Sequence, residues 1–256
     1  MIISRFNENQ IIKEDFPDIY EYLLGFELAL RKRGQVRNGQ HHWLELDNTP
    51  SKKFFAQFEE PKIVFSEIVS EPQFCLETQN LYPEATSFFI VGKNLKWLCA
   101  FLNSEPITVI FRLFYAGGEL VGKYRYKKTF LNSLPIPIPN PDSEGVIEKL
   151  VDYLTFYKTI YQNGQYENSI SNYYELIIDA IVYEILFISE FQSVNKTILK
   201  HLTDLIPINE SMSDEEKLGI IQSEYERLYH PDHPVRFAIE TLDSIEEVRI
   251  IREALQ

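Results

Sequence analysis

Apolar side chains recur at helical spacing near the start of the chain. They are Phe16, Ile19, Tyr20, Leu23, Leu24, Leu28 and Leu30. Spacings of three and four residues place these side chains on one face, which predicts a helix from about Asp15 to Gly34. Gly34 is expected to end the helix, because glycine readily adopts the backbone conformation that follows a last turn. The pair Asn38-Gly39 then predicts a turn, and residues 41–46 predict a short strand.

Short β-prone runs and one amphipathic helix are predicted in the next part of the chain. Runs rich in β-branched and aromatic residues predict strands at Lys62–Phe65, Gln73–Glu77 and Ser87–Val91. Asn94 stands where a helix cap is expected, directly before a run with apolar residues at helical spacing. This part of the chain is therefore expected to mix strands and helices.

The pattern becomes helical beyond Pro139, where apolar residues recur three and four positions apart over long stretches. Helices are predicted at residues 142–161, 170–191, 194–205, 214–229 and 234–255. The fourth begins with Ser213-Asp-Glu-Glu216, in which the serine and the last glutamate can each bond a backbone N–H of the helix start. We expect an α+β fold, with a mixed α/β domain at residues 1–140 and an all-helical region at residues 141–256.

Composition excludes a disordered chain and argues against a membrane span. The 256 residues are 45% hydrophobic and 14% aromatic, which is enough to build a sizeable core. The apolar run at residues 88–113 is interrupted by Lys93, Lys96 and Glu105, so no spanning helix is expected there. Cys75 and Cys99 are the two cysteines, in no metal-binding spacing, which predicts a reducing, cytoplasmic location.

The formal net charge of −13 is unevenly distributed along the sequence. Residues 1–140 hold 16 Lys+Arg and 16 Asp+Glu, whereas residues 141–256 hold 9 Lys+Arg and 22 Asp+Glu. An acidic chain is in general a poor match for nucleic acid, because binding depends on cations that neutralise phosphates. The neutral half weakens this objection, since it can gather its cations on one side. The acidic half is expected to form a solvated helical surface.

A cluster of cations lies in the segment Arg112–Pro139, after a predicted hairpin or tight loop at Gly117-Gly118. In a strand, alternate residues face opposite sides, so one face would carry Lys123, Arg125 and Lys127 and the other Tyr124, Tyr126 and Lys128. Cations interleaved with tyrosines are typical of a contact with a nucleic-acid backbone, and an arginine can in addition read a base edge. Lysines that protect an exposed edge strand give the same pattern, so both interpretations stay open. The candidate DNA contacts in this segment are Lys123, Tyr124, Arg125, Tyr126, Lys127 and Lys128.

Further hydrogen-bond donors lie in and near the first predicted loop. Arg33, Arg37 and Gln40 lead into that loop, and these residue types can pair with guanine or adenine. A cation in the last turn of a helix is also favourable for the helix itself, which is an alternative explanation for Arg33. His42 and Lys62 complete the set of candidate DNA contacts.

Metal and nuclease chemistry are not favoured by the sequence. Asp47 together with Glu60-Pro61-Lys62 has the spacing of a metal-dependent nuclease site. However, Pro61 interrupts the regular strand that such a site needs. The run His230-Pro-Asp-His233 offers two imidazoles without an evident third ligand. No catalytic residue and no metal ligand is therefore assigned.

Five stretches taken together carry a resemblance to a known family. They are GQHHWLEL at 39–46, EPKIVFSEI at 60–68, ATSFFIVGKNLKWLCAFLNSEP at 85–106, GGELVGKYRYKKTFLNSLPIPIP at 117–139 and IIDAIVYEILFISEF at 177–191. In this order and spacing they resemble the C-terminal target-recognition region of type IIG restriction–modification enzymes and TaqI-like adenine-N6 DNA methyltransferases. In such enzymes this region reads the target sequence, and helices frame the recognition domain.

The resemblance implies a sequence-specific module for double-stranded DNA without a catalytic site of its own. The family's methyltransferase half carries an Asn-Pro-Pro-Tyr motif and a glycine-bearing loop for S-adenosylmethionine, and neither occurs in this chain. S-adenosylmethionine and Mg²⁺ are then expected only in a separate catalytic part. The expected partners are double-stranded DNA and a catalytic methyltransferase or nuclease domain or subunit, with the chain as a separate polypeptide or a fragment of a longer enzyme.

An alternative is a protein-interaction module that docks a catalytic methyltransferase or nuclease subunit and binds little DNA of its own. The acidic region at residues 141–256 favours this interpretation, because its charge opposes contact with phosphates. In that case the predicted helix at residues 170–191 would supply the docking face.

Overall fold

The computed structural model describes residues 8–46, 51–84, 86–115, 122–161 and 168–254. They fall into two units, Met1–Glu59 and Glu60–Gln256. The predicted domain boundary at residue 140 does not coincide with this division. The residues before and after position 140 share one hydrophobic core, which lies in the second unit. A division of roles at residue 140 stays a prediction. The predicted turn at Gly117-Gly118 lies outside the described residues.

The first unit consists of short helices and contains a small core. That core consists of Ile12, Trp43 and Leu44. The helices are α1 (Asn9–Asp15), α2 (Pro17–Leu24), α3 (Glu27–Leu30), α4 (Gly34–Arg37) and α5 (Lys52–Ala56), followed by the 3₁₀ turn η1 (Gln57–Glu59). The single helix predicted over residues 15–34 is thus wrong.

Local backbone geometry explains the broken helix. Pro17 begins α2, where its missing N–H leaves no helical bond unmade, and Gly25 follows the last residue of α2. Gly34 is the first residue of α4 and does not end a helix, because Arg33 before it has an extended backbone. The turn predicted at Asn38-Gly39 is confirmed, with Gly39 in the left-handed region at φ +72°.

Residues 41–46 form a loop, so the strand predicted there is wrong. Trp43 and Leu44 are neighbours and both are buried, which the alternation of a strand does not allow. Side chains satisfy the backbone in place of a partner strand. The Arg33 guanidinium donates to the carbonyl oxygens of Trp43, at 2.8 Å, and Glu45, at 2.7 Å. The Glu45 carboxylate accepts from the His42 backbone N–H at 2.9 Å.

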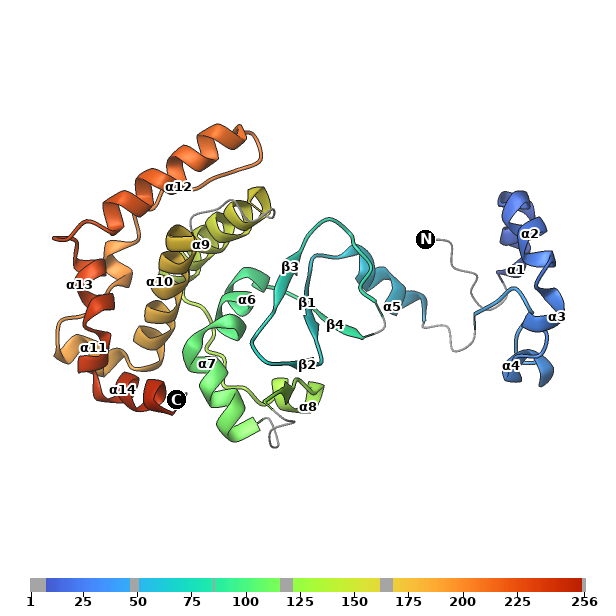
Figure 1. Cartoon of the computed structure of the whole chain (residues 1–256), viewed down its shortest axis with the longest axis horizontal. Coiled ribbons are helices and arrows are strands. Elements are labelled where there is room, and N and C mark those ends of the chain that lie inside the picture. Colours follow the sequence, from blue (N-terminus) through green and yellow to red (C-terminus); the bar gives the residue numbers. More distant parts are fainter. Residues whose placement is uncertain (1–7, 47–50, 85, 116–121, 162–167, 255–256) are drawn as a thin grey trace. The chain divides into compact units, whose positions relative to one another are not determined.

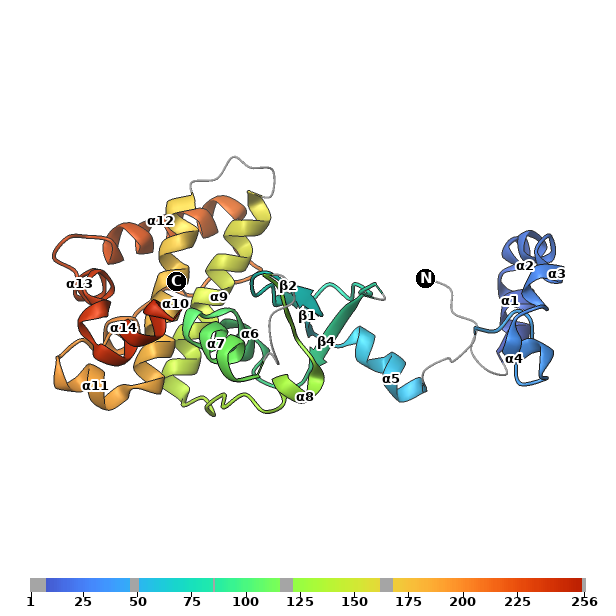
Figure 2. The ribbon, with the colours of Figure 1, turned by 60° about the horizontal axis from the view of Figure 1, so that its bottom comes forward.

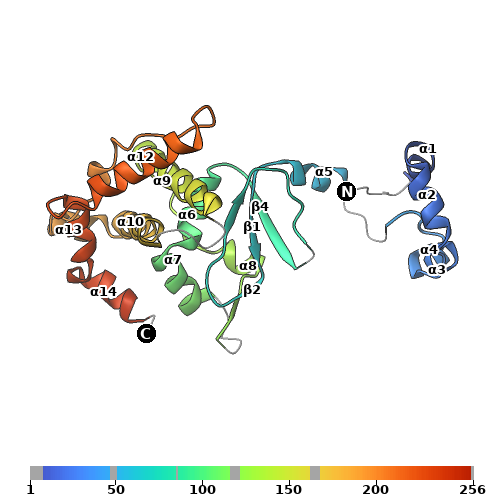
Figure 3. The ribbon, with the colours of Figure 1, turned by 45° about the horizontal axis from the view of Figure 1, so that its top comes forward.

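A three-stranded antiparallel sheet begins the second unit. Its strands are β1 (Lys62–Ser66), β3 (Cys75–Glu77) and β4 (Ser87–Val91), in the order β3-β1-β4. Figure 3 shows β1 and β4 side by side. The three predicted strands are confirmed, although β3 begins two residues later than expected. A second ladder joins β2 (Ile68–Val69) to β5 (Tyr124–Arg125), with Ile68 opposite Arg125.

Helices connect these strands with the C-terminal part. After β4 come α6 (Leu95–Asn103), α7 (Glu105–Ile110) and a π-helical turn, η2 (Phe111–Tyr115); α8 (Lys128–Leu131) follows β5. α6 packs against β1 and β3 on one side and against a long C-terminal helix on the other. Asn94 does stand at the helix cap, but it acts through its left-handed backbone, at φ 54°, and not through a side-chain bond.

The C-terminal part is helical, so the α+β fold class is confirmed. It contains α9 (Pro141–Ile160), α10 (Asn168–Leu186), α11 (Ile188–Ser193), η3 (Leu199–His201), α12 (Asp214–Leu228), α13 (Pro234–Glu240), η4 (Leu242–Ser244) and α14 (Glu246–Glu253). α9 and α10 lie side by side, and α12 packs on both of them (Figures 1 and 2). The capping box at Ser213 and Glu216 is confirmed, with bonds of 2.8 and 3.2 Å.

The helix predicted at residues 194–205 is wrong. Hydrogen bonds of two buried charged side chains hold this segment as a loop with the short 3₁₀ turn η3. The Glu184 carboxylate accepts from the backbone N–H groups of Ile198, at 2.6 Å, and Leu199, at 3.1 Å. Burial raises the pKa of Glu184, and these two bonds lower it in part. The Lys196 ammonium donates to the carbonyl oxygen and the hydroxyl of Thr241, each at 2.6 Å. These contacts hold the segment onto α10 and α13.

An aromatic cluster lies beneath β5 and joins the two ladders to η2. The Tyr126 ring lies 4.7 Å from that of Phe74 and 4.5 Å from that of Phe111, measured between centroids. Tyr124 lies 6.0 Å from Phe111 and 5.3 Å from Tyr126. Phe65 completes the cluster with an edge-to-face contact to Tyr126. Such pairs add to the stability that burial of the rings supplies.

Replacing Phe111 by alanine tests how much the second unit depends on this cluster. Phe111 is 1% exposed, so Phe111→Ala should lower the free energy of unfolding by about 3–5 kcal/mol in urea unfolding followed by circular dichroism. Phe114, in the same π-helical turn, is 75% exposed and provides the matched control. Phe114→Ala should change stability by about 0.5 kcal/mol or less. Equal effects of the two substitutions would contradict the assigned core.

Candidate nucleic-acid interface

The clearest candidate surface is the cation row, by which we mean Lys123, Arg125, Lys127 and Lys128. Lys123, Lys127 and Lys128 are exposed, and the Arg125 side chain is 38% exposed. Arg125 belongs to β5, and Lys127 caps α8 with an extended backbone. The predicted alternation is therefore observed for residues 123–127, whereas Lys128, predicted on the side of the tyrosines, is exposed as the first residue of α8.

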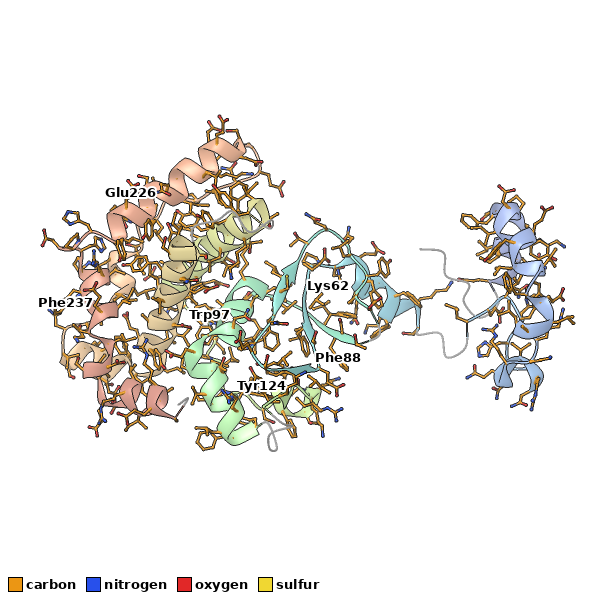
Figure 4. The ribbon with its side chains drawn as sticks, in the orientation of Figure 1. Lys62, Phe88, Trp97, Tyr124, Glu226 and Phe237 are labelled. Atoms are coloured by element: carbon orange, nitrogen blue, oxygen red, sulfur yellow. The ribbon has the colours of Figure 1, made fainter. Side chains whose placement is uncertain are left out.

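Tyr124 and Tyr126 are core residues, which corrects their prediction as DNA contacts. They are 2% and 3% exposed and belong to the aromatic cluster beneath β5. Figure 4 labels Tyr124 between α7 and α8. Burial raises the pKa of both phenols, so both stay neutral at physiological pH. The tyrosines support the cation row from beneath and do not present a stacking surface.

The lysines of the cation row keep their charges available. No carboxylate within the described part of the chain lies at ion-pair distance from Lys123, Lys127 or Lys128. The Lys127 ammonium lies 5.5 Å from the ring centroid of Phe130, a cation–π contact that leaves its donors free. Unpaired ammonium groups on one side of a short segment suit contact with phosphates.

Arg125 differs from the lysines because it has a fixed partner. Its Nε lies 3.2 Å from Oε1 of Glu67, the residue directly before β2. The Glu67 carbonyl oxygen also accepts from the Tyr126 backbone N–H at 2.8 Å, which extends the β2–β5 ladder by one bond. Sequence reasoning missed Glu67, since nothing in the pattern shows that residues 67 and 125 meet.

Lys62 is buried, which corrects its prediction as a DNA contact. The residue is 0% exposed and stands opposite Glu77 in the β1–β3 register. Its ammonium donates to Oε2 of Glu77 at 2.6 Å. Burial raises the pKa of Glu77, but the bond from Lys62 and backbone N–H bonds outweigh this and lower it overall. Lys62 thus stabilises the sheet and has no surface to offer a phosphate.

The remaining predicted contacts lie in the first unit. Arg33 is a structural residue, because its guanidinium donates to the carbonyl oxygens of Leu30, Trp43 and Glu45. Arg37, Gln40 and His42 are exposed. The His42 Nδ1 accepts from the Leu44 backbone N–H at 3.3 Å, which turns that nitrogen into the loop. Their role in DNA contact stays a prediction, as does that of the cation row.

An open groove with a volume of about 840 Å³ lies between β3 and the helices α6, α7, α9 and α10. Its wall includes both cysteines and the carboxyl group of Asp179. Burial raises the pKa of Asp179 to about 7, although a bond from the Glu105 backbone N–H, at 2.8 Å, acts in the opposite direction. Burial likewise raises the pKa of Cys99 to about 12, so this thiol stays protonated. The groove does not include the cation row.

Over the residues that the structure describes, no three histidine, cysteine or acidic side chains group so as to hold a metal ion. No single described helix is long and apolar enough to cross a membrane. The pair of Leu95–Asn103 with Glu105–Tyr115 reaches that length and composition only together, and it bends by 66°.

Residues 18–136 match the family described as the TaqI-like C-terminal specificity domain. The predicted resemblance to TaqI-like specificity domains is confirmed for this stretch. The match supports a DNA-recognition module of restriction–modification enzymes. It includes α2–α5 of the first unit, except for Pro17, together with the sheet and the cation row of the second, and it ends before α9.

Replacing Lys62 distinguishes a structural role from DNA contact. Lys62→Ala leaves the Glu77 carboxylate without its partner, so the free energy of unfolding should fall by about 3–5 kcal/mol in urea unfolding. The double variant Lys62→Met with Glu77→Leu should recover most of this loss, because apolar residues of similar volume replace buried pairs well. Lys93→Ala, at an exposed lysine, is the control. Unchanged stability with weakened DNA binding would contradict the structural role.

Asp179 predicts a specific dependence of stability on pH. Its folded pKa of about 7 lies above its ordinary value of 3.8, so the native state binds the proton more tightly than the unfolded state does. Its effect on stability is therefore most favourable below about pH 4 and is lost as the pH rises through about 7. Asp179→Asn removes this dependence and retains an oxygen that accepts from the Glu105 N–H.

Asp179→Asn should thus stabilise the protein at pH 8, by up to about 4 kcal/mol, with little effect near pH 4. Melting temperatures of both proteins across this pH range provide the measurement. Asp152→Asn, at a carboxylate on α9 that is about one-third exposed and pairs with Lys96, is a control for loss of one charge together with its ion pair. A stability difference that stays constant with pH would be incompatible with the assigned titration.

Proposed function

We propose that this chain is the part of a restriction–modification system that recognises a specific sequence in double-stranded DNA. The observation that carries the proposal is the cation row, three of whose members are unpaired and exposed, within the stretch that matches TaqI-like specificity domains. In this function the lysines contact phosphates and fix the register on the duplex, while other donors read base edges.

Catalysis in this system belongs to a separate methyltransferase or nuclease domain or subunit of type IIG kind. S-adenosylmethionine and Mg²⁺ would be bound there, and no residue of this chain is assigned to either. The acidic helices α9–α14 are then a spacer or docking region, which holds the recognition part at a fixed place relative to the catalytic part. A cytoplasmic location is part of the same proposal, since the DNA to be modified lies there.

A second candidate function is docking of that catalytic part with little DNA binding of its own. Several large apolar side chains are exposed on the C-terminal helices and the residues that flank them, and Figure 4 labels Phe237 on α13. Exposed apolar residues on an acidic surface suit a protein partner better than DNA. The exposed side chains in question are Ile188, Val194, Phe237 and Ile250. Docking and DNA recognition are compatible in one chain.

Removal of the three unpaired lysines tests the proposed function. The variant Lys123→Gln, Lys127→Gln, Lys128→Gln should bind random-sequence duplexes more weakly than the wild type at low salt. The slope of log affinity against log salt should become shallower by about 1 for each lysine that contacts a phosphate. Binding is measured by fluorescence anisotropy of labelled duplexes at several salt concentrations.

A matched variant keeps the change in net charge the same. Lys149, Lys200 and Lys217 lie in the acidic region, and their joint replacement by Gln should leave the salt slope unchanged. If both triple variants weaken binding equally, general charge and not the cation row governs binding. Absence of binding by the wild type at low salt would refute DNA recognition by this chain alone and favour the docking function.

A further inference from the structure

We propose that Arg125 reads a guanine of the DNA target and that Glu67 is the positioning residue that orients its guanidinium. The inference rests on the proposed function, because it assigns a base contact within the surface that would bind DNA. It assigns different roles to neighbouring cations, with base reading at Arg125 and phosphate contact at Lys123 and Lys127.

The orientation of the Arg125 guanidinium is the first observation. Its Nε is buried and lies 3.2 Å from Oε1 of Glu67, in an ion pair without hydrogen-bond geometry, whereas the side chain as a whole is 38% exposed. The exposed surface therefore belongs to other atoms of the side chain, and the two terminal nitrogens have no acceptor among the described residues. The two terminal nitrogens of an arginine can bind O6 and N7 of guanine together in the major groove.

The rigidity of the backbone at Arg125 is the second observation. Arg125 stands opposite Ile68 in the β2–β5 ladder, and the residues on both sides of it, Tyr124 and Tyr126, are buried in the aromatic cluster. A side chain that discriminates between bases has to be held to a fraction of an ångström by its support. The backbone bond from Tyr126 to the carbonyl oxygen of Glu67 fixes the positioning carboxylate to the same support.

The chemistry of the neighbouring residues is the third observation. Lys123 and Lys127 lie two residues before and after Arg125, or roughly 6.6 Å along an extended chain in each direction. Each offers a point charge without the planar pair of donors that a guanine edge requires. Because Glu67 and Arg125 are both about one-third exposed, their ion pair contributes little to stability.

Selection of bound duplexes from a random pool, followed by sequencing, tests the assignment with the full chain. The wild type should enrich a motif that contains a guanine at one defined position. Arg125→Ala and Arg125→Lys should lose roughly 5- to 150-fold of the preference at that position and keep the preferences elsewhere. Lys127→Ala should weaken binding to all sequences alike, with the motif unchanged.

Glu67→Gln distinguishes orientation of Arg125 by Glu67 from a merely structural role of Glu67, because only the former affects the guanine preference. Removal of a carboxylate beside the cation row should strengthen binding to non-target duplexes, because repulsion of the phosphates decreases. The same variant should show a weaker guanine preference, because the guanidinium is less well oriented. Glu71→Gln, at an exposed carboxylate beyond β2, is the control and should leave the motif unchanged.

Two results would overturn the inference in different ways. If the wild type binds and enriches a motif, but Arg125→Ala keeps every base preference, then Arg125 does not read a base and the proposed function stands. If the wild type binds no duplex at low salt, the proposed function fails for this chain and the inference fails with it. A guanine preference that survives in Arg125→Ala but is lost in Lys127→Ala would assign base reading to Lys127.

Discussion

The second unit depends on burial of two tyrosines on the inner side of β5. Tyr124 and Tyr126 pack with Phe65, Phe74 and Phe111, which come from the sheet, the loop before β3 and the π-helical turn. Because successive strand residues face opposite sides, burial of these rings turns the residues between and beside them toward solvent. The position of the cation row is therefore a consequence of the core, and the core cannot change without moving it.

For contact with DNA, the local balance of charge matters more than the net charge of −13. Charges on a protein surface are screened over about 8–10 Å at physiological salt, so a DNA phosphate responds mainly to the groups near it. The excess of carboxylates lies in the C-terminal helices, and several of them are occupied by internal contacts. Glu184 accepts from two backbone N–H groups, and Glu224 pairs with Arg227 at 2.6 Å. An acidic chain can thus carry a surface on which cations dominate.

Periodicity predicted β1, β3 and β4, the fold class and the helices α9, α10 and α12, because these follow from which side chains face the core. It failed at residues 15–34, where Pro17 and Gly25 divide the helix, and at sites where one polar side chain decides the local structure. Lys62 finds Glu77 fifteen positions away, and Arg33 reaches the Glu45 carbonyl oxygen across twelve. Neither partner is visible in a hydrophobic pattern. The sequence therefore predicts surface donors at Lys62 and Arg33, where the structure has a buried lysine and an arginine that closes a loop. Glu67 was missed for the same reason, since its partner is 58 residues distant.

A comparison of Arg33 with Arg125 shows which contacts distinguish a structural arginine from a reading one. Both were predicted as DNA contacts from residue type and neighbourhood, and both carry a permanent charge. Arg33 donates from Nε to the carbonyl oxygen of Leu30 and from Nη2 to those of Trp43 and Glu45, so these donors are engaged. Arg125 makes only an ion pair with Glu67, at 3.2 Å from Nε, and its terminal nitrogens have no acceptor among the described residues. The side of the guanidinium that remains open, and not the presence of the charge, determines what an arginine can recognise.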